Sequence, residues 1–171
     1  MKWLGAILVF LACTGFGLAF AQEQKMRLKW VQNLRKAVIL LRGQILYANA
    51  AISEALRESG NRMEGELGEF LLRVSERVEE GEGESLREIW TEEIQKEKDN
   101  WPMEKQELED FLQFGKELGY LDLAMQEKTL NLYMEKLELS EGNLLKTLDA
   151  KVRMSASLGV LGGVFLVIVL I

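Results

Sequence analysis

The chain has 171 residues, of which 27 are acidic and 21 basic, so its formal net charge is −6; it has no histidine and one cysteine, Cys13. This composition excludes disulfide frameworks, Cys/His zinc sites and histidine-based catalytic triads. The acidic balance argues against a nucleic-acid surface.

The remaining chemistry also argues against an enzyme. The glutamates lie among lysines and arginines at ordinary surface spacing, which disfavours the two alternatives that stay open, a carboxylate-only metal site and a paired-carboxylate hydrolase. The sequence contains no nucleophile constellation and no phosphate-binding glycine loop. We therefore expect no catalytic residue, no cofactor, no metal and no small-molecule substrate.

An uncharged run, Trp3–Ala21, follows Lys2 at the start of the sequence. At about 1.5 Å per helical residue, its length matches a hydrocarbon core of about 30 Å. A secretory signal is the alternative, because residues 19–21, AFA, resemble a small-residue cleavage site. The run is longer than most signal sequences and continues directly into helix-forming sequence. We therefore predict a retained transmembrane helix over residues 1–21.

A second uncharged run, Met154–Ile171, ends the sequence and predicts a transmembrane helix over residues 154–171. A buried core helix is the alternative, but so small a chain has too little protein to surround such a run. Small residues on one face of each helix predict close packing with another helix. These residues are Cys13, Gly17 and Ala21 in the first helix and Ser155, Gly159 and Gly163 in the second.

Basic residues gather on the inner side of both runs. They are Lys25, Arg27, Lys29, Arg35, Lys36, Lys146, Lys151 and Arg153, whereas the outer side has Lys2 alone. Because cytoplasmic segments next to a membrane are rich in lysine and arginine, residues 22–153 are predicted to form a soluble domain in the cytoplasm. The predicted localisation is that of a multi-pass protein of the cell membrane.

Apolar residues three and four positions apart indicate one long helix after the first run. They are Val31, Leu34, Val38, Leu41, Ile45, Ala48, Ile52 and Ala55, and Gly60 is the predicted stop. This heptad seam packs either within the domain or against another copy. We favour packing within the domain, because the flanking positions show no complementary charge pattern, and a homo-oligomer stays open.

Two shorter helices are predicted next. The first carries the apolar stripe Met63, Leu67, Phe70, Leu71, Val74 and Val78, and Gly81 and Gly83 separate it from the second. Ser85 and Glu88 match the capping box that starts a helix. The second helix has the stripe Leu86, Ile89, Trp90 and Ile94, and Pro102 ends it. The acid-rich stretch SERVEEGEGESLREIWTEEIQKEKD is either a solvated face, which we favour, or a surface for a basic partner.

The last two helices complete the predicted fold. Leu108, Phe111, Leu112 and Leu118 predict one helix, which Gly119 ends; Asp122 is the predicted N-cap of the other. The fold class is all-α, with two transmembrane helices flanking a cytoplasmic antiparallel bundle of about five or six helices. The predicted core contains Leu34, Val38, Leu41, Ile45, Phe70, Val74, Trp90, Phe111 and Leu112.

Four stretches carry a resemblance over essentially the whole chain: LRGQILYANAAISEAL, RVEEGEGESLREIW, FGKELGYLDLAMQEKTLNLYMEKL and LGVLGGVFLVIVLI. Their order resembles the stage III sporulation protein AB family of endospore-forming bacteria. The middle is also similar to the cytoplasmic helical domains of the type II secretion and pilus platform protein. That protein has two such domains and more membrane helices, so its assembly geometry does not transfer directly.

The resemblance implies a scaffold in the secretion-like channel complex that joins mother cell and forespore. It places the protein in the mother-cell membrane around the forespore, with its helical domain docking a secretion-type ATPase and other channel subunits. Two other functions stay open. One is a membrane-anchored coiled-coil signalling or sensor protein, which needs an external domain, and the predicted topology leaves almost nothing outside the membrane. The other is a secreted helical protein held by its C-terminal helix, which requires cleavage after Ala21.

Overall fold

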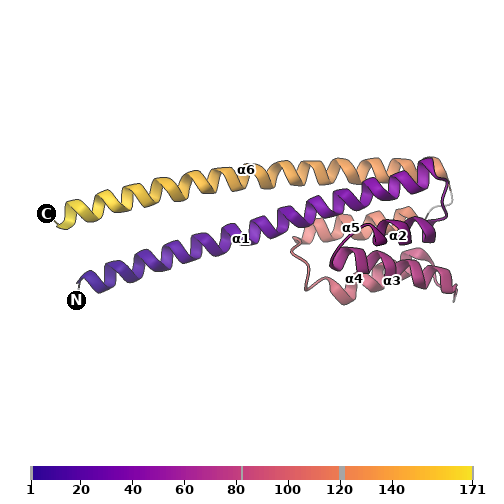
Figure 1. Cartoon of the computed structure of the whole chain (residues 1–171), viewed down its shortest axis with the longest axis horizontal. Helices are drawn as coiled ribbons and strands as arrows, with labels where there is room; N and C mark the ends of the chain where they lie inside the picture. The colour runs from indigo at the N-terminus through magenta and orange to yellow at the C-terminus, as the bar shows by residue number, and fades with distance from the viewer. Residues whose placement is uncertain (1, 82, 120–121, 171) are drawn as a thin grey trace. The chain divides into compact units, whose positions relative to one another are not determined.

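Helices make up all the regular structure of the described chain. The structure is a computed structural model that describes residues 2–81, 83–119 and 122–170, with side chains described for residues 22–81, 83–119, 122–148 and 150. In chain order the elements are α1 (Lys2–Arg42), the π-helix η1 (Gly43–Tyr47), α2 (Ile52–Asn61), α3 (Glu66–Glu80), α4 (Leu86–Glu97), α5 (Lys105–Leu118) and α6 (Leu123–Leu170) (Figure 1). The predicted all-α class agrees with this architecture.

The structure corrects the prediction of two transmembrane helices. Among the described residues, no helix has both the length and the apolar character needed to cross a membrane. The parts of α1 and α6 whose side chains are described carry charges at short intervals, such as Lys25 and Arg27 in α1 and Lys128 and Glu135 in α6, and charges are costly in hydrocarbon. The prediction of two transmembrane helices is therefore wrong, and the multi-pass membrane localisation that rested on it is not supported.

The small-residue faces predicted for those helices lie outside the residues whose side chains are described. They are Cys13, Gly17, Ala21, Ser155, Gly159 and Gly163. Their role in helix packing therefore stays a prediction.

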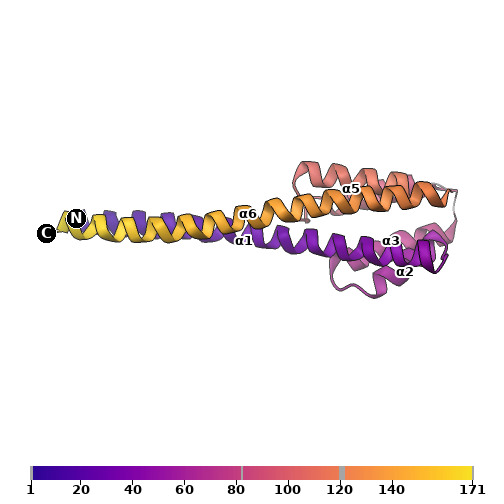
Figure 2. The same ribbon diagram turned by 90° about the horizontal axis from the view of Figure 1, so that it is seen from above.

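The chain divides into two compact units. One is Trp30–Ser140, and the other combines Met1–Lys29 with Glu141–Ile171. Within the first unit, α2 contacts α3, α3 contacts α4, and α4 contacts α5, so these consecutive helices pack against one another. Figure 2 shows α5 running alongside the first part of α6. The predicted domain limits at residues 21 and 153 stay a prediction.

The long helix predicted through Ala55 is interrupted, which is a second correction. α1 ends at Arg42, the π-helix follows, and α2 begins only at Ile52. Between them, Asn49 has a φ of 56°, a left-handed conformation that asparagine tolerates better than most residues. Ile45 is buried, but Ala48 is exposed. The three- and four-residue spacing of apolar side chains continues through Ala55, although the α-helix ends at Arg42, so this spacing did not reveal the break.

Aromatic side chains form the centre of the core. Trp90 is fully buried, and its indole Nε1 donates a hydrogen bond to the Phe111 carbonyl oxygen at 3.1 Å. Phe70 meets Trp90 edge to face, with ring centroids 4.9 Å apart, an arrangement that aromatic pairs prefer. Phe111 and Trp101 also pack against Phe70. Of the predicted core, all members are buried except Leu112, which is half-buried.

Gly115 lets α5 approach Trp90 closely. A Cβ at this position would lie 2.2 Å from atoms of the Trp90 ring, far inside van der Waals contact. The indole therefore occupies the space that any other side chain at position 115 would need. The apolar pattern did not predict this contact. Helix α5 was expected from its large apolar residues, and a glycine between them gives no such signal.

Local signals set the start of α4. The Glu88 backbone N–H donates to Ser85 Oγ at 3.4 Å, and the Ser85 backbone N–H donates to a Glu88 carboxylate oxygen at 2.8 Å. The bond from the Ser85 backbone, with a second from its hydroxyl, lowers the pKa of Glu88. Before this capping box, Gly81 and Gly83 have φ values of 64° and 89°, which glycine adopts without steric cost.

The contact between α5 and α6 combines stacked rings with polar pairs. Phe114 and Tyr133 stack with centroids 4.5 Å apart. Lys136 Nζ lies 2.6 Å from Asp110 Oδ1, and the Ser140 hydroxyl donates to Glu107 Oε1 at 2.6 Å. Burial raises the pKa of Tyr133 well above its ordinary value. These contacts fix α6 to α5 over successive turns of both helices.

A first prediction compares the core with the helix cap. Trp90→Ala removes the central ring and is expected to lower the free energy of unfolding by about 3–5 kcal/mol, whereas Ser85→Ala is expected to cost about 1 kcal/mol. Urea unfolding of the purified chain, followed by circular dichroism, measures both. Equal and negligible losses would show that α4 is not part of a packed core.

A second prediction uses two helical glycines. Gly115→Ala places a methyl group inside the Trp90 ring and is expected to destabilise the protein by about 1–3 kcal/mol. A Cβ added at Gly142 in α6 would meet no atom within 4 Å. Gly142→Ala is therefore expected to stabilise the helix by up to about 1 kcal/mol. Thermal melts of both variants should shift in opposite directions; a shared direction would contradict the close contact at Gly115.

Candidate interaction surface

Ion pairs join α3 to α4 in one connected group, here called the α3–α4 charge network. Its cations are Arg73, Arg77 and Lys96, and its carboxylates are Glu69, Glu84, Glu92, Glu93 and Glu97. The arginines are four residues apart on α3, so they lie on the same face of that helix. More carboxylates than cations take part, and the network is therefore acidic.

Glu93 is the buried centre of this network. It is only 2% exposed, and its carboxylate accepts hydrogen bonds from Arg73 Nε at 3.3 Å, Arg77 Nη1 at 3.0 Å and Lys96 Nζ at 2.6 Å. Burial raises the pKa of Glu93, but the hydrogen bonds from Lys96, Arg77 and Arg73 outweigh it and hold the pKa below its ordinary value. Glu93 is therefore ionised at neutral pH, as a buried carboxylate with charged partners can be.

Arg77 connects the turn before α4 to both helices. Its guanidinium donates to Glu92 at 2.9 Å and also to Glu84 and Glu93. Hydrogen bonds to Glu92, Glu84 and Glu93, in that order of effect, raise the pKa of Arg77. One half-buried side chain thus positions three carboxylates, two of them exposed.

Further exposed carboxylates extend the network outward. Glu76 and Glu80 lie on the same face of α3 as the two arginines and are exposed, because residues three, four and seven apart share a helix face. Neither has an ion pair within the described part of the chain. Glu76, Glu80, Glu84 and Glu92 together are called the acidic α3–α4 surface.

The structure brings together only some of the residues singled out in the sequence. Ser85 and Glu88 lie at the start of α4, directly after Glu84 of the network. Trp90 is on the buried side of the same helix. Sequence reasoning identified the acid-rich stretch but did not connect Arg73 with it. The signal was the spacing of Arg73 and Arg77, which matches that of Glu93 and Glu97 on the next helix.

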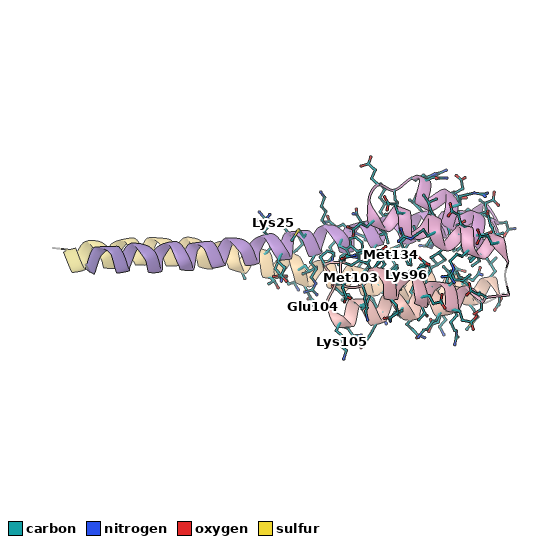
Figure 3. All side chains as sticks on the ribbon, turned by 90° about the horizontal axis from the view of Figure 1, so that it is seen from below. Lys25, Lys96, Met103, Glu104, Lys105 and Met134 are labelled. Atoms are coloured by element: carbon teal, nitrogen blue, oxygen red, sulfur yellow. The ribbon has the colours of Figure 1, made fainter. Side chains whose placement is uncertain are left out.

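The start of α5 carries a weaker ion pair than those of the α3–α4 charge network. Figure 3 shows Lys96 on α4 and Glu104 and Lys105 at the start of α5. Lys105 is 90% exposed and lies 3.9 Å from Glu109, a geometry worth little stability in water. In the described residues, no group of three or more Asp, Glu, Cys or His side chains has an arrangement suited to a metal ion. The charged side chains here form ion pairs and an outward surface.

Glu93→Gln tests whether the buried carboxylate organises the network. It leaves two arginines short of a charged partner, so we expect a loss of about 1–3 kcal/mol in unfolding free energy. Glu92→Gln, at a side chain 56% exposed, should cost under about 1 kcal/mol. Urea unfolding at neutral pH measures both losses.

The pH dependence supplies the control for the Glu93 prediction. The pKa of Glu93 is lower in the folded state than its ordinary value. The ionised carboxylate therefore stabilises the folded protein above the ordinary carboxyl pKa of about 4, and this stabilisation is lost as the pH falls through the folded pKa. The free energy of unfolding, measured from pH 7 down to acid pH, should therefore decrease less steeply for Glu93→Gln than for the parent. An unchanged slope would contradict this role.

Known proteins are similar to this chain in sequence and in fold. The family model for stage III sporulation protein AB (spore_III_AB) matches residues 2–171. The stage III sporulation protein AB of Bacillus subtilis (strain 168) is 27% identical over 170 residues, which cover 99% of each chain. A solved structure of a stage III sporulation protein AB (SpoIIIAB) aligns with a TM-score of 0.66 at 24% identity, covering 72% of this chain and 97% of its own.

At that identity the solved structure shows a shared fold, and the family assignment rests on the sequence match. The matched segment spans nearly every residue, including all the helices of the acidic α3–α4 surface. The chain therefore belongs to the stage III sporulation protein AB family.

Proposed function

We propose that this protein is a non-enzymatic scaffold in the channel complex between mother cell and forespore, and that it docks the secretion-type ATPase or another channel subunit. Membership of the stage III sporulation protein AB family gives it a role in sporulation. That membership also disfavours the two alternatives, a signalling sensor and a secreted helical protein.

The acidic α3–α4 surface is the observation that carries the docking proposal. Its carboxylates project from two adjacent helices and from the turn between them. Arg77 and the buried Glu93 hold that turn in place through hydrogen bonds. A partner with a basic patch would therefore meet two carboxylates, Glu84 and Glu92, that Arg77 already positions, so these two need little side-chain ordering on binding.

The interior supports a scaffold better than a catalyst. A small cavity between α1, α5 and α6 measures about 20 Å³ and is lined by residues that include Val31, Leu34, Tyr133 and Leu137. A cavity of this size holds about one water molecule and is far smaller than the usual ligand pocket. The folded unit therefore offers its outer surface, rather than this cavity, for recognition.

Charge reversal on the surface tests the docking proposal. Glu76→Lys and Glu80→Lys, made separately, place a cation where a basic partner is expected, so recovery of the ATPase or other channel subunits should fall by about tenfold or more. The measurement is affinity purification from sporulating cells at matched abundance of each variant, together with the yield of heat-resistant spores.

Glu109→Lys is the matched control, since Glu109 on α5 is 54% exposed and its ion pair with Lys105 is long, at 3.9 Å. It should recover partners as the parent does. Circular dichroism establishes that all three variants are folded. If Glu76→Lys and Glu80→Lys behave like the control, the acidic α3–α4 surface is not the docking site.

A further inference from the structure

The outward face of α6 carries a regular row of exposed apolar side chains. Met125, Leu132 and Leu139 are 43%, 46% and 69% exposed and lie seven residues apart. Single exposed leucines are ordinary on protein surfaces. A row with a seven-residue repeat is different, because it stays on one side of the helix and occupies one of the two positions per heptad that form the seam of a coiled coil, while Lys128 and Glu135 occupy the other.

A shallow depression beside this row has the pattern of a coiled-coil contact. It is lined by Ala124, Glu127, Lys128, Asn131, Leu132 and Glu135. These six residues form two overlapping sets with the spacing i, i+3, i+4 and i+7, starting at Ala124 and at Lys128. In a coiled coil, four residues with this spacing form the hole that receives one side chain of the facing helix. The short side chains of Ala124 and Asn131 leave the depression open.

Charges on either side of Leu132 indicate which helix fits. Lys128 and Glu135 are both exposed, and within the described chain neither has an ion pair. In an antiparallel pair of identical helices centred near Leu132, Lys128 of each copy faces Glu135 of the other. A parallel pair would instead place like charges together, which is unfavourable.

We propose that α6 binds α6 of a second copy of this chain, antiparallel, about a two-fold axis beside Leu132. Leu132 of one copy enters the hole between Lys128 and Glu135 of the other, and Met125 faces Leu139. The interface is isologous, so each favourable contact occurs twice. This proposal uses residues separate from the acidic α3–α4 surface and does not depend on the docking function.

The area of one helix pair is small compared with the roughly 1,200 Å² that stable interfaces bury. The pairing is therefore weak between free chains and strengthens when several copies are held in one assembly, where the effective concentration is high. A covalent trap is accordingly the suitable measurement, because it records a weak contact that dilution would remove.

Disulfide trapping in the full chain tests the geometry. With Cys13, the single native cysteine, replaced by serine, Leu132→Cys should give a covalent dimer on mild oxidation in sporulating cells. Leu139→Cys alone should give little, since its position faces Met125 of the other copy. Co-expressed Met125→Cys and Leu139→Cys chains of different length should give the mixed dimer. Efficient dimers from Leu139→Cys alone, or none from Leu132→Cys, would overturn the antiparallel pair.

Charge exchange then tests the specificity. In the Leu132→Cys chain, Lys128→Glu alone and Glu135→Lys alone should each lower the dimer yield by about tenfold, because like charges then face each other. The combined Lys128→Glu and Glu135→Lys chain should regain the parent yield. Lys105→Glu on α5, at a side chain 90% exposed, should change nothing. Single reversals without effect, or a combined chain that does not recover, would show that no such pairing exists.

Discussion

The contact between the Trp90 indole and the backbone of α5 at Gly115 determines how the helices of the larger unit are spaced. The ring lies where a Cβ at position 115 would be, and its N–H is satisfied by the Phe111 carbonyl oxygen. With α4 and α5 at this distance, Phe70 of α3 closes over the ring from another side. The stacking of Phe114 on Tyr133 then brings α6 to α5. Helices α3, α4 and α5 therefore meet at one buried ring.

α4 links the interior to the surface. Ile89, Trp90 and Ile94 of this helix are buried in the core, and the adjacent Glu93 is buried among cations of α3. A buried carboxylate is tolerated only with charged or hydrogen-bonding partners, so the packing of α4 and the acidic network form together. The apolar row on α6 is of another kind, since its side chains are exposed and contribute little to the core.

Local sequence signals predicted the middle of the fold well and missed what depends on distant residues. Gly81, the capping box of Ser85 and Glu88, Pro102 and Gly119 each act on neighbouring backbone, and the helices begin and end near them. The break after Arg42 was missed because a π-helix followed by a left-handed Asn49 leaves the apolar spacing intact. The uncharged runs predicted separate membrane helices, whereas α1 and α6 continue through charged sequence. The burial of Glu93 was hidden because two of its partners come from α3.

The way Arg77 holds its three carboxylates has a consequence for association in salt. The ion pair at 3.0 Å between Arg77 and the buried Glu93 is screened little, so ionic strength leaves Arg77 in place. The electric field of the exposed carboxylates is screened strongly, because at about 0.15 M salt it decays over a Debye length of about 8 Å. The rate at which the proposed basic partner would find this surface therefore depends on ionic strength, whereas the Arg77–Glu93 pair beneath the surface does not.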